Sequence, residues 1–155
     1  MPIVSATIED ADVVTALIAE LLAEVEATMD QRLFNVEPRA MAARLGEALR
    51  DGRYLCLLAR DPANAAVGVL TLTECFSLYA GGSFGIIPEL YVQPPFRGRG
   101  LGRALMARAG RIAVERGWSQ LEVTTPPLPG FDRTLAFYRR EGFTMRGGRK
   151  LGLRL

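Results

Sequence analysis

Residues 89–105 read Glu89-Leu90-Tyr91-Val92-Gln93-Pro94-Pro95-Phe96-Arg97-Gly98-Arg99-Gly100-Leu101-Gly102-Arg103-Ala104-Leu105. The segment begins with the apolar character of a strand, and an amphipathic helix starts near Leu101. Between them lies the pattern Arg-x-x-Gly-x-Gly. Glycines let the backbone approach an anion without a Cβ in the way, and the amides at the start of a helix carry partial positive charge. We therefore predict a diphosphate-binding loop here.

Two better-known phosphate loops do not fit this pattern. No Gly-Lys-Ser/Thr follows, so it is not a Walker A loop, and its glycine spacing differs from the dinucleotide-binding fingerprint. Residues 97–155 carry 12 Arg and one Lys against 4 acidic residues, whereas residues 1–96 carry 6 Arg against 13 acidic residues. The basic half fits a phosphorylated ligand or nucleic acid, and a surface turn with solvated arginines stays open as the plain alternative.

Apolar periodicity upstream of the loop predicts alternating helices and strands. Asp10 is suited to cap the first helix and Pro38 to occupy the first turn of the second. The expected elements are a strand at 2–8, a long helix after Asp10, a helix at 38–49, a hairpin of strands 53–60 and 66–76, and a strand at 84–92.

Downstream we expect a helix at 101–116, a strand at 120–125, a short helix at 133–141 capped by Asp132, and a final hairpin at 143–155 that turns at Gly147-Gly148. The unit from Phe84 to Thr125 has the length of a right-handed crossover, so its two strands should be parallel. Short turns make the other neighbours antiparallel. The expected fold is α/β, or α+β in some schemes, with a mixed sheet and helices on both faces.

Length and composition narrow the class of protein. A chain of 155 residues suits one domain over 1–155. The absence of histidine excludes a His-based triad and most zinc sites, so we expect no metal. Cys56 and Cys75 lie in apolar runs and are expected to be buried thiols in a reducing compartment. No signal segment or membrane-spanning run is present, so we expect a cytoplasmic protein without a membrane partner.

Residues 89–105 closely resemble the coenzyme A signature of the GNAT acetyltransferases. There a strand ending in Leu-x-Val, followed by Pro and an aromatic residue, precedes an Arg-x-x-Gly-x-Gly/Ala loop. A second stretch, Ala136-Phe137-Tyr138-Arg139-Arg140-Glu141-Gly142-Phe143, matches the family pattern Phe-Tyr-x-x-x-Gly-Phe. The resemblance implies the GNAT fold, a mixed and mostly antiparallel sheet of about seven strands with a central splayed parallel pair. It also implies acetyl-CoA as co-substrate.

By this resemblance, the pantetheine arm of acetyl-CoA lies in the gap between the splayed strands. A local bulge frees one N–H, from Val92 or Tyr91, for the thioester carbonyl. Backbone amides of residues 97–103 hold the diphosphate. The implied cofactor-binding residues are Leu90, Tyr91, Val92, Arg97, Gly98, Arg99, Gly100, Leu101, Gly102, Arg103, Thr125, Phe137 and Tyr138.

Four of these assignments carry a further expectation. Arg97, Arg99 and Arg103 are expected to touch phosphates directly, although an exposed helix arginine is an equally ordinary interpretation of Arg103. Thr125 stands where many relatives have Asn, so one contact to the pantetheine arm is lost or is supplied by a threonine hydroxyl.

The resemblance also implies two catalytic residues. Tyr138 corresponds to the family tyrosine that protonates the departing thiolate, and the alternative is that it only packs in the core. Glu89 is the candidate general base, directly or through a water, and the alternative is a solvated or salt-bridged strand charge. Strand alternation places Ile87, Glu89 and Tyr91 on one face.

The predicted function is transfer of an acetyl group to a primary amine by direct attack in a ternary complex. A small cationic amine is favoured if Asp30, Glu37, Glu74 and Glu89 line one cleft. A protein or peptide N-acetyltransferase remains an alternative, as does a non-catalytic acyl-CoA sensor. Nucleic acid is not expected as a partner, because Trp118 alone does not provide aromatics interleaved with the arginines.

The oligomeric state stays open. The apolar tail, Leu151, Leu153 and Leu155, could form a homodimer interface, and it could equally complete the monomer's own sheet.

Overall fold

The computed structural model describes residues 1–35, 37–126, 129–146 and 150–153. The chain divides into two compact units, Met1–Thr124 and Thr125–Leu155. None of the helices in the described residues is long and apolar enough to cross a membrane.

The strands and the α-helices of the first unit follow the predicted order, with two short helices and a break in the strand expected at 84–92 in addition. The elements of this unit are β1 (Ile3–Ser5), the short helix η1 (Ile8–Asp10), α1 (Ala11–Met29), α2 (Pro38–Arg50), β2 (Tyr54–Arg60), β3 (Ala66–Ser77), β4 (Gly82–Ile87), β5 (Leu90–Val92), the short helix η2 (Pro94–Phe96), α3 (Leu101–Glu115) and β6 (Leu121–Val123).

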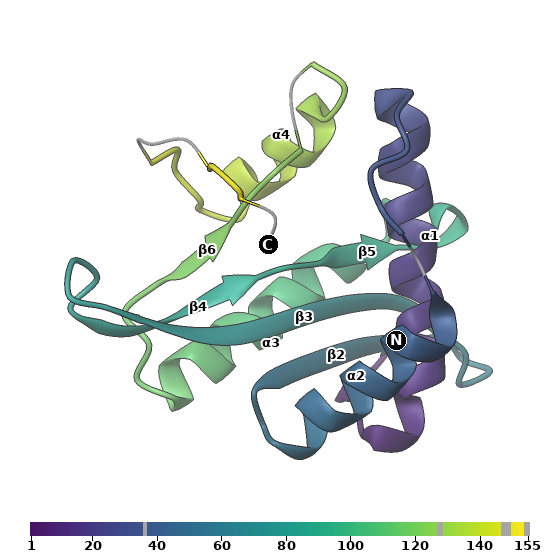
Figure 1. Ribbon diagram of the computed structural model, residues 1–155, viewed down its shortest axis with the longest axis horizontal. Helices are drawn as coiled ribbons and strands as arrows, with labels where there is room; N and C mark the ends of the chain where they lie inside the picture. Colours follow the sequence, from purple (N-terminus) through teal and green to yellow (C-terminus); the bar gives the residue numbers. More distant parts are fainter. Residues whose placement is uncertain (36, 127–128, 147–149, 154–155) are drawn as a thin grey trace. The chain divides into compact units, whose positions relative to one another are not determined.

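Six strands of this unit form one mixed sheet in the order β1-β2-β3-β4-β6, with β5 also paired to β3 (Figure 1). The pairs of β1 with β2, β2 with β3, and β3 with β4 and β5 are antiparallel. β4 and β6 are parallel, and α3 lies between them in the chain. The predicted crossover and the mixed sheet are confirmed.

The strand expected at 84–92 is interrupted by a β-bulge. Thr73 of β3 pairs with Ile86, whereas Leu70 pairs with Leu90. The two β3 residues 71–72 therefore face the three residues 87–89. One extra residue reverses the alternation of side chains beyond it. As a result Ile87 falls on the opposite face from Glu89 and Tyr91, and the expectation that all three share a face was wrong for Ile87.

Helices cover both faces of the sheet. α1 and α2 pack on the face that carries Cys56, Leu58, Val69 and Tyr91. α3 contacts β2 and β3 from the other face, and Figure 1 shows it passing behind them. The apolar residues predicted to share a face of α3 are all buried: Leu101, Leu105, Ala109, Ile112 and Ala113.

Two predicted cap residues make other contacts. Asp10 precedes α1, but its carboxylate accepts the Thr7 N–H at 2.8 Å and binds Arg60 at 2.6 Å. α4 (Asp132–Arg140) starts one residue earlier than predicted, after Phe131, so Asp132 is inside the helix. Of the two cysteines, Cys56 is buried as expected and Cys75 only partly.

The second unit contains α4 and the segment that follows it. Gly142 ends the helix region with a φ of 91°, in the left-handed conformation that favours glycine. The predicted final hairpin is not formed in residues 143–146 and 150–153, which contain no strand. Its predicted turn at Gly147-Gly148 lies outside the described residues. The sheet therefore has six strands among the described residues where about seven were expected.

A substitution at Gly85 of β4 tests the packing beside the parallel pair of β4 and β6. A Cβ at this position would lie 2.4 Å from two ring atoms of Trp118 and 2.6 Å from Leu121 Cδ2. Gly85→Ala is therefore expected to lower the free energy of unfolding by about 1–3 kcal/mol, because a buried indole cannot move aside freely. Urea unfolding followed by circular dichroism measures this change.

Gly110→Ala is the matched control. Gly110 lies inside α3, and a Cβ there would meet no atom within 4 Å. The substitution should raise the free energy of unfolding by about 0.5–1 kcal/mol, because alanine favours a helix. Equal stability of the Gly85→Ala variant and the wild type would contradict the packing described for β4.

Candidate active site

The loop between β5 and α3 has the backbone geometry of an anion cradle. Gly98 and Gly100 have φ values of 75° and 81°, which other residues rarely adopt. A Cβ at either glycine would meet nothing within 4 Å, so the space above the loop is open. The amides at the start of α3, beginning at Leu101, have no acceptor within the helix. These residues fit the diphosphate of coenzyme A.

Two arginines of the loop contact aromatic rings. The guanidinium of Arg99 lies 5.5 Å from the centre of the Phe96 ring and that of Arg97 lies 5.4 Å from the centre of the Tyr91 ring. Arg99 is exposed beside the open loop, as a phosphate contact requires. Arg103 lies in the first turn of α3 and is also exposed.

The Arg97 side chain turns away from the loop. Its Nε donates to the Val92 carbonyl at 2.7 Å, and its two Nη atoms donate to the Glu24 carboxylate of α1 at 3.0 and 2.6 Å. The predicted direct phosphate contact therefore does not fit this conformation, because the fork of donors already holds β5 against α1. The backbone amide of Arg97 remains a candidate for the diphosphate.

One edge of β5 is open. The pairing of β4 with β6 ends at Ile87 and Val123, and β5 pairs with β3 alone in the described sheet. Thr71 donates its N–H to the Glu89 carbonyl, and Gln93 donates its N–H to the Val67 carbonyl. Every second residue of an antiparallel strand forms hydrogen bonds with the same neighbouring strand. Tyr91 lies two residues from both Glu89 and Gln93, so its N–H also points to β3. The N–H groups of Leu90 and Val92 then point to the open edge.

Glu89 lies in the bulge and is held from three directions. The hydroxyls of Tyr54 and Thr71 both donate to its Oε2 atom. Its own N–H donates to the Thr71 hydroxyl oxygen at 3.0 Å. Thr71 is fully buried, so these hydrogen bonds fix the carboxylate on the face that α1 and α2 cover. The Glu89 Oε1 atom takes no part in the contacts with Tyr54 and Thr71.

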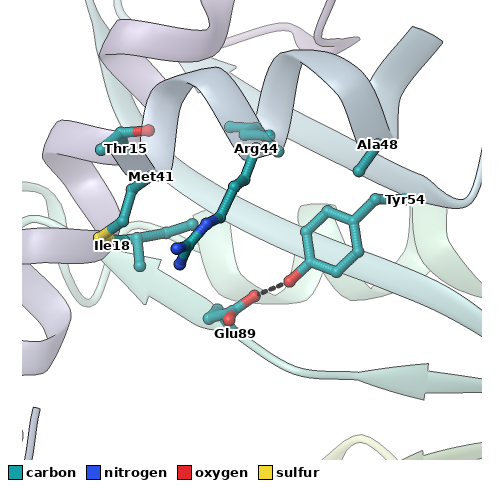
Figure 2. A pocket seen from close by; sticks show the side chains of 8 residues that line it. Thr15, Ile18, Met41, Arg44, Ala48, Tyr54 and Glu89 are labelled. Atoms are coloured by element: carbon teal, nitrogen blue, oxygen red, sulfur yellow. Dashed lines mark hydrogen bonds between the residues drawn. The ribbon is translucent and has the colours of Figure 1, made fainter. Parts of the chain in front are cut away.

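Glu89 also lines a cavity of about 240 Å³ beneath α1 and α2. Figure 2 shows Tyr54 reaching Glu89 from β2, and the Arg44 guanidinium extending from α2 toward the same side. The wall between the polar groups is mostly apolar. The lining residues are Thr15, Ile18, Met41, Arg44, Leu45, Ala48, Tyr54 and Glu89.

Burial and the Glu89 carboxylate raise the pKa of two neighbouring groups, Tyr54 and Cys56. Burial, reinforced by the nearby carboxylate, raises the pKa of the Tyr54 phenol well above its usual value. The same two causes raise the pKa of the Cys56 thiol to about 12. Tyr54 therefore stays a hydrogen-bond donor at neutral pH. Cys56 stays protonated, which makes it a poor nucleophile.

Three predicted site residues belong to the second unit. Tyr138 is buried, and its ring meets those of Phe137 and Phe143 edge-on, with centroids 5.3 and 5.4 Å away. Burial raises the pKa of Tyr138 to about 12, so its phenol keeps its proton at neutral pH. Thr125 is half-buried at the start of this unit.

The predicted acidic residues do not gather in the cavity. Glu89 lines it, but Asp30 caps the end of α1 and Glu37 precedes α2. Glu74 accepts hydrogen bonds from the Trp118 indole and the Ser83 hydroxyl, both at 2.8 Å. Trp118 itself is buried, as expected.

Sequence reasoning missed Tyr54, Thr71 and Arg44 as site residues. Thr71 gave a usable signal, since it is a polar residue in the apolar run Val67–Leu72. Tyr54 and Arg44 gave none, because only the strand register and the packing of α2 bring them to Glu89.

Comparison with known proteins identifies the family. Residues 51–145 match the model of the acetyltransferase (GNAT) domain family. The chain is also 35% identical to the aminoalkylphosphonate N-acetyltransferase of Salmonella typhimurium over 143 residues, which span 89% of this chain and 81% of that protein.

Solved structures share the fold at lower identity. A predicted acetyltransferase with acetyl-CoA from Clostridium acetobutylicum superposes with a TM-score of 0.79 at 16% identity, covering 99% of this chain and 95% of that one. A ribosomal-protein-alanine N-acetyltransferase from Brucella melitensis biovar Abortus 2308 has a TM-score of 0.73 at 22% identity over 100% of both chains. With the family match and the curated relative, we conclude that this chain belongs to the GNAT family and is an acetyl-CoA-dependent N-acetyltransferase.

Proposed function

We propose that this enzyme acetylates a small primary amine, which binds in the Glu89 cavity and attacks acetyl-CoA directly in a ternary complex. The observation that carries the proposal is the Glu89 carboxylate, which lines a cavity of about 240 Å³ and directly precedes β5, the strand with an open edge. Pockets for drug-sized ligands measure about 300–1,000 Å³, so this cavity favours a smaller acceptor over a peptide or an aminoglycoside. The curated relative, whose name specifies aminoalkylphosphonates, supports a small amine as well.

The residues of the first unit suit the two substrates in different ways. Acetyl-CoA supplies an activated acyl group and a thiolate leaving group. The amides from Arg97 to Arg103 are suited to hold its diphosphate, and the Val92 N–H is suited to stabilise negative charge on the acyl oxygen. The register favours Val92 over Tyr91 for this role, because the Tyr91 N–H points to β3.

Glu89 and Tyr138 are the proposed base and acid. A primary amine is protonated at neutral pH and must lose a proton before it attacks, and Glu89 Oε1 is the acceptor for that proton, directly or through a water. The Tyr138 phenol, whose pKa is raised to about 12, is still protonated at neutral pH and can donate to the departing thiolate. The raised pKa of Cys56 argues against an acyl-enzyme on that thiol.

A thiol-release assay with acetyl-CoA and a panel of small amines tests the function. We expect turnover that depends on the amine. Binding of coenzyme A without turnover of any small or peptide amine would instead support a non-catalytic acyl-CoA sensor.

Gly98 tests the diphosphate loop. Gly98→Asp places a negative charge where the phosphates are expected, in a position with open space around it. Asparagine and aspartate tolerate a positive φ better than other residues do, so the loop should keep its shape. We expect coenzyme A to bind at least about 10-fold more weakly, because like charges repel at the helix start. Isothermal titration calorimetry measures the affinity.

Gly98→Asn is the neutral variant of nearly the same shape, and its affinity for coenzyme A should stay close to that of the wild type. If the Asp and Asn variants bound coenzyme A equally well, the diphosphate would not lie over this loop.

Glu89→Gln tests the general base. Glutamine keeps the size of the side chain but cannot take the ammonium proton, so we expect kcat/KM for the amine to fall by about 100-fold or more. Affinity for coenzyme A should not change. Steady-state thiol release and calorimetry measure the two quantities.

Glu115→Gln provides the matched control at the end of α3, where Glu115 binds Arg108 at 3.4 Å. It should leave kcat/KM unchanged. Wild-type turnover by the Glu89→Gln variant would remove Glu89 from the mechanism.

Tyr138→Phe tests the general acid. Phenylalanine keeps the ring contacts with Phe137 and Phe143 and removes only the hydroxyl. We expect kcat to fall by about 100-fold or more, with little change in KM for either substrate. Tyr79→Phe removes a hydroxyl from the turn between β3 and β4, outside the cavity lining, and should leave kcat intact. A Tyr138→Phe enzyme with normal kcat would leave Tyr138 a packing role only.

A further inference from the structure

Arg44 is the one cationic side chain that lines the described cavity. It is exposed on α2, and its guanidinium extends toward the side where Glu89 lies (Figure 2). Arg44 makes no ion pair or side-chain hydrogen bond with any residue in the described part of the chain. Its five donors therefore remain for a ligand or for water.

Three arginines of the same unit, Arg53, Arg60 and Arg97, differ from Arg44 in this respect. Arg53 binds Asp51 at 2.9 Å, Arg60 binds Asp10 at 2.6 Å and Arg97 binds Glu24 at 2.6 Å. Each of these guanidinium groups has a carboxylate within the protein that offsets its charge. The Arg44 charge faces the cavity without such a partner among the described residues.

The Glu89 carboxylate does not serve as that partner. Its Oε2 atom accepts the hydroxyls of Tyr54 and Thr71, and no described ion pair joins it to Arg44. The cavity thus presents a carboxylate and a guanidinium as separate groups, with apolar side chains such as Ile18, Met41 and Leu45 around them. A ligand that matches all three features has an ammonium group, a short alkyl chain and an acidic group.

We propose that Arg44 binds the acidic group of the acceptor, and that the acceptor is a zwitterionic aminoalkyl acid whose ammonium group lies toward Glu89. This inference rests on the proposed function and adds the class of amine. The acidic group is a phosphonate or a carboxylate, since both have the oxygen spacing that a guanidinium binds with two parallel hydrogen bonds. The proposal also replaces the predicted cleft rich in acidic residues. Of the four acidic residues predicted to line that cleft, only Glu89 lines the cavity.

A panel of amines that share one aminoethyl group tests the acceptor class. Aminoethylphosphonate and β-alanine carry an acidic end, ethanolamine a neutral end and ethylenediamine a cationic end. For the wild-type enzyme we expect kcat/KM to be about 10- to 100-fold higher with an acidic amine than with ethanolamine. The ratio between aminoethylphosphonate and β-alanine decides which acid the site prefers. Equal or better turnover of ethanolamine or ethylenediamine would overturn the proposal.

Arg44→Gln tests the residue itself. The variant should lose about 10- to 100-fold in kcat/KM for the preferred acidic amine, mainly through KM, while ethanolamine turnover stays within about twofold. Arg44→Lys keeps the charge without the fork of donors and should fall in between. Arg50→Gln, on the same helix but outside the cavity lining, should match the wild type. An equal loss with acidic and neutral amines would assign Arg44 a purely structural role.

Binding of propylphosphonate gives a readout that does not depend on turnover. This probe has the acidic group and the alkyl chain but no amine, and calorimetry should show binding to the wild type that Arg44→Gln weakens by about 10-fold or more. Failure of every amine to react would count against the proposed function, and the propylphosphonate experiment would still decide the role of Arg44. Affinity that is unchanged by Arg44→Gln, or no binding to the wild type, would overturn the inference.

Discussion

The extra residue in the bulge at 87–89 positions both halves of the site. Beyond it, β5 keeps its hydrogen bonds to β3 but has no partner on its other edge in the described sheet, because β6 stops pairing at Ile87. The same residue turns Glu89 to the face that α1 and α2 cover. A regular strand could not do both, since its side chains alternate with a period of two and its edge would stay paired. The proposed thioester site and the proposed acceptor cavity therefore share one cause.

The proposed anion site of the loop relies on backbone amides rather than on the Arg97 side chain. Arg97 is committed to Glu24 and the Val92 carbonyl, so its charge is offset within the protein. The amides at the start of α3 remain for an anion, beside the exposed Arg99, and Gly98 and Gly100 in the left-handed conformation make them accessible. Arg97 then acts beside the open edge, where it fixes the carbonyl of the residue whose N–H is proposed to stabilise the acyl oxygen.

The sequence predicts most of the fold and about half of the candidate site. Periodicity located α1 to α4 and the β2–β3 hairpin but not the short helices η1 and η2, and crossover length predicted the parallel β4–β6 pair. The sequence pattern could not locate the break at Pro88-Glu89, because a bulge depends on the register with β3 rather than on local pattern. For the same reason Tyr54 and Thr71 escaped detection. Arg44 was missed because solvent-facing arginines on a helix look alike until the packing of α2 distinguishes them.

Tyr54 of the first unit and Tyr138 of the second differ in what their protons can do. Both have a raised pKa and remain neutral near pH 7, but for different reasons. The pKa of Tyr54 is raised by burial and by the Glu89 carboxylate. Its hydroxyl already donates a hydrogen bond to that carboxylate, so Tyr54 is suited to position the proposed base. Tyr138 is raised by burial alone, and its described contacts are aromatic rings. A phenol whose proton is not already donated to a carboxylate can give it to a thiolate, and this supports Tyr138 rather than Tyr54 as the proposed acid.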